Sequence, residues 1–152
     1  YIKTFDNYAY QRMPQKEFCV AVTWGPDGLL AMSGAVEADT GVVLDFYLPE
    51  GQSKAQLWID GWLIPKGASN VEDAHLFLNY MMRPDVAAAD SNYTWYATAN
   101  LTAKPMVDAE VTSSPAAFPT SDQVEKMYTM ALMPPKAERM QTRTWTDFVS
   151  GN

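Results

Sequence analysis

The sequence contains one histidine and one cysteine, which removes most metal-binding and nucleophilic chemistries. A disulfide needs two cysteines, and a structural zinc site needs several Cys or His ligands. A Ser/His/Asp triad would have to use His75, which lies in a segment with helical periodicity. We therefore interpret His75 as a helix-surface residue, and Cys19, inside an apolar run, as a small buried hydrophobic residue.

The chain also lacks a long apolar run and an excess of basic residues. Runs such as Phe18-Cys-Val-Ala-Val22 fall far short of the ~20 residues that a membrane-spanning helix needs. Eighteen acidic residues against 11 basic ones give a net charge of −7. This balance disfavours a nucleic-acid partner, which requires a basic surface, and permits weak steering of a cationic ligand.

Sequence motifs for common catalytic sites are missing as well. The sequence has no glycine-rich phosphate loop, no G-x-S-x-G and no H-E-x-x-H. We expect no cofactor, no metal and no enzymatic activity. A hydrolase that uses a pair of carboxylates stays an alternative, because acidic residues are plentiful.

Strand-like and helix-like segments alternate along the chain, which predicts an α/β fold. Runs of β-branched and aromatic residues predict strands at 18–24, 41–48 and 57–64, the first of them buried on both faces. Residues 25–28 predict a turn, and residues 93–99 an extended segment. Caps, prolines and apolar periodicity predict helices from the Asn70 cap to Arg83, over 85–89, from a Ser121 cap to Ala131, and over 137–149.

Aromatic and acidic residues stand together at the ends of the predicted strands. In Trp58-Ile-Asp60-Gly-Trp62, alternation places Trp58, Asp60 and Trp62 on one face. Trp24 ends a predicted strand and Asp27 follows in the turn, at the edge where open α/β sheets bind ligands. A carboxylate and a ring face together suit an alkylammonium group. From the residues alone, core tryptophans and a turn-forming aspartate explain the pattern equally well.

The order of several segments resembles the periplasmic polyamine-binding proteins of ABC importers. The resemblance lies in LWIDGWLIPKGASNVEDAHLFLNYMMRPDVAAADSNYTWYATAN (57–100), FCVAVTWGPDG (18–28), AKPMVDAEV (103–111) and RTWTDFVSGN (143–152). It implies the α/β type II periplasmic-binding-protein fold, which is bilobal and hinged, with this chain as its C-terminal part only. Residues 1–42 would belong to the second lobe, residues 43–92 to the hinge crossing and the first lobe, and residues 93–152 again to the second lobe.

The resemblance also implies a site and partners. By position, Trp24 and Asp27 are similar to the family's W-x-x-D ligand pair. Trp58 and Asp60 look like the aromatic and the carboxylate that bind one amine, and Tyr96 looks like another wall of the aromatic box. The implied protein captures putrescine or spermidine in the periplasm and delivers it to an ABC permease in the membrane.

Two questions stay open at this point. Asp27 is typical of putrescine binders, whereas Trp58 resembles the spermidine binders. The alternative ligands are another small cation or an amino-acid-like solute. The resemblance further implies an N-terminal part of the same receptor, which would supply the opposite wall of the cleft.

Overall fold

The computed structural model of the chain describes residues 2–5, 7–49 and 54–151. Within these ranges the regular structure is helical, and no strand is formed. The elements in chain order are α1 (Ala9–Arg12), η1 (Met13–Gln15), α2 (Gly25–Glu37), α3 (Val71–Met81), α4 (Pro84–Thr94), η2 (Lys104–Met106), α5 (Ala109–Thr112), α6 (Ser121–Lys126) and α7 (Pro135–Ser150).

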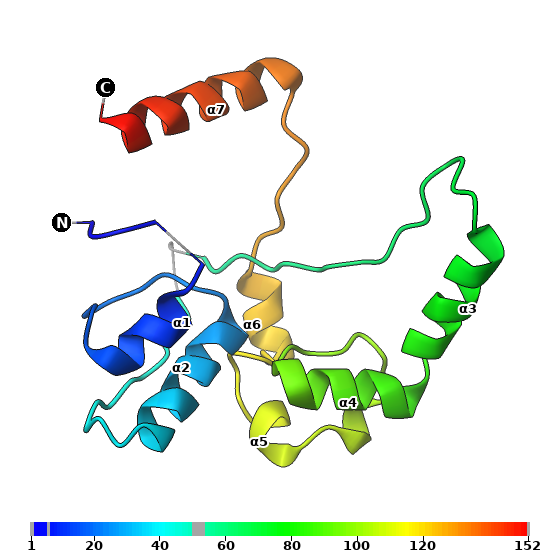
Figure 1. The fold of residues 1–152 in the computed structure, drawn as a ribbon, viewed down its shortest axis with the longest axis horizontal. Helices are drawn as coiled ribbons and strands as arrows, with labels where there is room; N and C mark the ends of the chain where they lie inside the picture. The colour runs from blue at the N-terminus through cyan, green and yellow to red at the C-terminus, as the bar shows by residue number, and fades with distance from the viewer. Residues whose placement is uncertain (1, 6, 50–53, 152) are drawn as a thin grey trace.

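The helices form one packed body from which α3 and α7 project (Figure 1). Helices α1 and α2 lie together, α4 and α5 share a core with α2, and α3 reaches outward (Figure 1). Helix α7 stands apart at the end of an extended segment. Its apolar residues meet the N-terminal segment, where the Phe5 ring lies 5.0 Å from Trp145 and 5.6 Å from Phe148.

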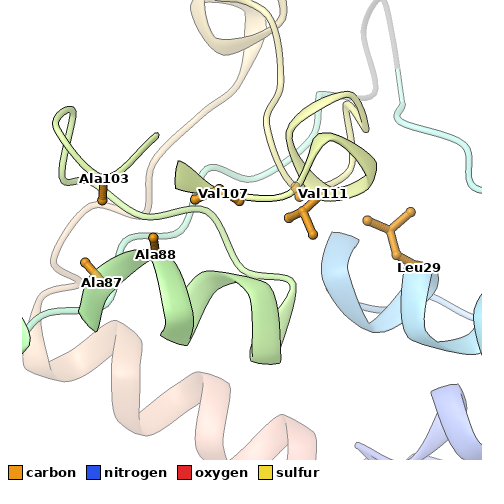
Figure 2. Packing of buried hydrophobic residues seen from close by; sticks show 7 residues of the cluster. Leu29, Ala87, Ala88, Ala103, Val107 and Val111 are labelled. Carbon is orange, nitrogen blue, oxygen red and sulfur yellow. The ribbon is translucent and has the colours of Figure 1, made fainter. Parts of the chain in front are cut away.

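A small core joins α2 to the segment that begins with α4 (Figure 2). Its residues are mostly alanines and valines, which allow the backbones to approach closely. The core therefore fixes the first half of α2 relative to α4 and α5, and both sides carry residues of the site described below. The buried members are Leu29, Ala87, Ala88, Ala103, Val107, Val111 and Ala117.

The three predicted strands are wrong as elements of this structure. A strand is held by a ladder of hydrogen bonds to a neighbour. Within the described ranges the one bridge outside helices is the parallel contact of Gln56 with Tyr128. The segment 41–48 keeps a strand's alternation, with Val43 95% and Tyr47 76% exposed between half-buried neighbours. It has the pattern of a strand without a partner to pair with.

The lack of a neighbouring strand also overturns the burial predicted for residues 18–24. Val20 and Val22 are exposed, and so is Cys19, which we had interpreted as buried. The interpretation of Cys19 assumed that a neighbouring strand would cover its side chain, and no described segment does so. His75 is exposed on α3, as predicted.

The predicted helices are present, with three corrections. Helix α3 begins after Asn70, and α7 covers the predicted 137–149. The predicted 85–89 helix extends to Thr94, so the first part of 93–99 is helical rather than extended. Helix α2 was not predicted, because Gly25-Pro-Asp-Gly28 has the composition of a turn and in fact forms the first turn of a helix.

The third correction concerns α6, which begins and ends earlier than predicted. The cap is Thr120 rather than Ser121: its hydroxyl accepts from the Gln123 N–H, and the Gln123 side chain accepts from the Thr120 N–H. The helix stops at Lys126 instead of Ala131. Tyr128 instead exchanges backbone hydrogen bonds with the extended segment 55–57, which holds the chain out of the helix.

Candidate functional site

The start of α2 carries the first two candidate residues. Trp24 is the N-cap in an extended conformation, Pro26 occupies the first turn, and Asp27 follows in the same turn. A carboxylate at this end is favoured by the partial positive charge of the helix N-terminus. Gly25 lies between them because a Cβ there would overlap the backbone carbonyl of Ala116. The close approach of Ala116 therefore fixes where Trp24 and Asp27 sit.

Trp58 and Asp60 come from the extended segment before α3. The Trp58 indole N–H donates to Asp60 Oδ1 over 2.8 Å, so the two side chains lie on the same face, as alternation predicts. The Trp58 ring lies 5.6 Å from the Trp24 ring, tilted by 51°. This ring pair brings the 57–60 segment to the start of α2.

Tyr96 completes the cluster from the turn after α4. Its hydroxyl donates to Asp27 Oδ1 over 3.2 Å, across 69 positions of sequence. Burial raises the pKa of Tyr96 to about 12, with help from the charge and hydrogen bond of Asp27 and from the charge of Asp60. Both carboxylates therefore lie close enough to act on one phenol. Tyr96 stays neutral, and a hydrogen-bond donor, at physiological pH.

The structure thus brings all five candidate residues together, and leaves one neighbour out. Trp62, predicted on the face of Trp58 and Asp60, packs edge-on against Phe77 of α3 at 5.3 Å. Sequence reasoning missed Gly25 as a supporting residue. The signal that could have found it is the Gly-Pro pair, which suits a helix start as well as a turn.

The cluster has the chemistry of a cation site. Each carboxylate accepts one hydrogen bond from a ring donor, Tyr96 on Asp27 and Trp58 on Asp60, and can accept more. The rings are open to a ligand, since Trp24 is 45%, Trp58 53% and Tyr96 39% exposed. Charge-assisted hydrogen bonds and cation–π contacts are therefore available at the same place.

Neither a metal-holding cluster nor a membrane-spanning helix is found in the described part of the chain. Among its residues, no group of three His, Cys, Asp or Glu side chains is placed to hold a metal ion. No described helix combines the length and the apolar character needed to cross a membrane.

Comparison with known proteins places these features in a family. A family model described as bacterial extracellular solute-binding protein matches residues 10–120. The putrescine-binding periplasmic protein PotF of Escherichia coli is 39% identical over 135 residues, which cover 89% of this chain and 36% of PotF. The putrescine-binding periplasmic protein SpuD of Pseudomonas aeruginosa is 30% identical over 152 residues, 99% of this chain and 41% of SpuD.

A putrescine/agmatine-binding protein of Pseudomonas aeruginosa is 26% identical over 153 residues, 100% of this chain and 41% of that protein. The chain thus spans about two fifths or less of the length of these curated relatives. The matched segment contains Trp24, Asp27, Trp58, Asp60 and Tyr96. The chain belongs to the family of bacterial extracellular solute-binding proteins.

Proposed function

We propose that this chain forms the C-terminal part of a periplasmic receptor that binds putrescine or spermidine and delivers it to an ABC permease. The observation that carries the proposal is the convergence of two carboxylates and three rings from three separate segments. The names of the relatives support the ligand class, since several are called putrescine- or spermidine-binding.

The charges of the cluster favour a polyamine over the alternatives. A primary ammonium group has three N–H donors and no acceptor, and so matches the free acceptor positions of Asp27 and Asp60. The methylene chain between two ammonium groups can lie along the Trp24 and Trp58 rings. An amino-acid-like solute would bring a carboxylate into a cluster that already holds two, and none of the five residues carries a positive charge to pair with it.

The proposal includes a second wall that this chain does not supply. Exposed ion pairs contribute only ~0–1 kcal/mol, because water screens them. Enclosure between two lobes lowers the local dielectric and strengthens the same contacts. The proposal keeps the division into lobes. One lobe contains residues 1–42 and 93–152, and residues 43–92 form the hinge crossing and part of the other lobe. The N-terminal part of the receptor is likewise proposed.

Asp60 provides the direct test. In the full-length protein, Asp60→Asn should weaken putrescine and spermidine binding by roughly 2–4 kcal/mol, because it removes the charge from a desolvated ion pair. Isothermal calorimetry measures the loss. The amide keeps the shape of the side chain and an oxygen that can accept from the Trp58 indole, so the fold should be unchanged.

Asp73→Asn serves as the matched control, because Asp73 is exposed on α3, which projects away from the body (Figure 1). It should bind polyamines as tightly as the unmodified protein. Absence of polyamine binding in the unmodified receptor would refute the proposed function. Normal binding by Asp60→Asn would instead remove Asp60 from the site.

A further inference from the structure

The turn that presents Tyr96 has an uncommon backbone conformation. Trp95 is the C-cap of α4, with a φ of 63° in the left-handed region, where residues other than glycine and asparagine are uncommon. Its N–H donates to the Ser91 carbonyl over 2.8 Å. Its ring packs against the core cluster. A bulky residue holds such a conformation only where its surroundings impose it.

Side chains of α4 hold both backbone polar groups of Tyr96. The Ser91 hydroxyl donates to the Tyr96 carbonyl, and Ser91 is 1% exposed. The Thr94 hydroxyl accepts from the Tyr96 N–H over 3.3 Å and donates to the Asp90 carbonyl over 2.8 Å. Both backbone polar groups of Tyr96, the residue that contacts Asp27, are therefore hydrogen-bonded to side chains of α4.

Ser91 is the buried polar residue in a stretch of α4 whose other buried residues are Ala87 and Ala88. Alanine would fill this space without a polar atom to satisfy, so the hydroxyl is explained by the hydrogen bond that it makes. A serine inside a helix commonly bonds backward to a carbonyl of the preceding turn. Here it bonds forward, to the Tyr96 carbonyl beyond the end of the helix, and so sets where Tyr96 lies.

We propose that Ser91 and Thr94 are positioning residues, which hold the Tyr96 backbone so that its phenol reaches Asp27. The inference rests on the proposed function, because it assigns these residues to the same polyamine site. Their hydrogen bonds join them to the backbone, and neither belongs to the five candidate ligand-binding residues. Loss of either hydroxyl should release the turn and separate the phenol from Asp27, while both carboxylates stay in place.

The test follows the ionisation of Tyr96 in the full-length protein without ligand. With 13C-labelled tyrosine, Tyr96→Phe identifies the Tyr96 signal in the NMR spectrum. At about pH 11 the Tyr96 phenol should be protonated to a larger extent in the unmodified protein than an ordinary tyrosine, because its pKa is raised. In Ser91→Ala and in Thr94→Val it should be mostly ionised, since it leaves its partly buried place beside Asp27.

Two further variants separate positioning from general stability. Thr94→Ser keeps the hydroxyl and should retain the protonated signal. Ser113→Ala removes a hydroxyl that donates to the Glu110 carbonyl at the end of α5, and should leave the Tyr96 signal unchanged. Thr94→Val also keeps the proposal testable if Ser91→Ala does not fold.

Putrescine binding gives the second readout. Ser91→Ala and Thr94→Val should bind it at least ~10-fold more weakly than the unmodified protein, and Thr94→Ser about normally. A Tyr96 signal that reports the same protonated fraction at about pH 11 in Ser91→Ala, in Thr94→Val and in the unmodified protein would overturn the inference, whatever the affinity. Because this signal needs no ligand, its outcome is independent of whether the unmodified receptor binds polyamines.

Discussion

Gly25 and Gly34 lie in the same helix, yet replacing each with alanine has opposite expected effects on the free energy of unfolding. Alanine is better than glycine inside a helix by about 0.5–1 kcal/mol. At Gly34 the nearest atom to an added Cβ is Cγ of Pro14 at 3.6 Å, an ordinary contact. Gly34→Ala should therefore gain most of that amount.

At Gly25 the added Cβ would overlap the carbonyl oxygen of Ala116 and lie 2.9 Å from its carbon. These are backbone atoms, so the approach can be relieved only by moving the loop or the helix. Overpacking of this kind costs about 1–3 kcal/mol, which exceeds the helix-propensity gain. The net expectation is a loss of about 0.5–2 kcal/mol for Gly25→Ala.

Urea unfolding followed by circular dichroism compares the two variants with the unmodified full-length protein. Calorimetry with putrescine should add a second difference, because movement of the helix start displaces Trp24 and Asp27. Gly34→Ala should bind normally. If Gly25→Ala proved as stable as Gly34→Ala, the close approach of Ala116 to α2 would be wrong, and with it the account of how Trp24 is fixed.

Two other predictions concern Tyr96 and Asn100. The raised pKa of Tyr96, about 12 against 10.0, contributes stability below about pH 10 that is lost as the pH rises to 12. A two-unit shift corresponds to about 2.7 kcal/mol, which we reduce to about 1 kcal/mol because Tyr96 is 39% exposed and water screens the interaction. Tyr96→Phe should lack this loss in urea unfolding across that pH range, and an identical pH profile would contradict the raised pKa of Tyr96, which comes first from burial and then from Asp27. The Asn100 side chain accepts from the N–H groups of Thr102 and Ala103 and donates to the Met82 carbonyl over 2.8 Å. Asn100→Ala should lower the unfolding free energy by about 1–3 kcal/mol in urea unfolding, and an unchanged value would contradict these hydrogen bonds.

The pairing of an aromatic with an acidic residue in two segments of the candidate site was visible in the sequence because it is local. Trp58 and Asp60 are two positions apart and share a face of an extended segment, whereas Trp24 and Asp27 are three apart and come together in the first turn of a helix. Tyr96 came from the family resemblance. What the five residues bind is a prediction that neither the spacing nor the geometry tests.

The errors in the fold come from contacts that no local pattern encodes. Residues 18–24 have strand composition, but a strand forms only beside another strand, and the described chain provides none there. Helix α2 was missed because its first turn holds two glycines. Their presence is explained by distant residues, the Ala116 carbonyl at Gly25 and the Phe46 ring at Gly28. Helices α3 and α7, by contrast, follow from their own periodicity and caps.

The Trp24 and Trp58 rings have a consequence for how the site can be observed. At 5.6 Å and a tilt of 51°, the electronic transitions of the two indoles couple and give the pair its own circular dichroism signal. This coupling falls with the inverse cube of the ring separation. Any ligand that inserts between the rings, or any motion that parts them, therefore changes the ultraviolet spectrum of the protein itself. The chain carries an optical reporter at the point where its segments meet, and needs no added dye.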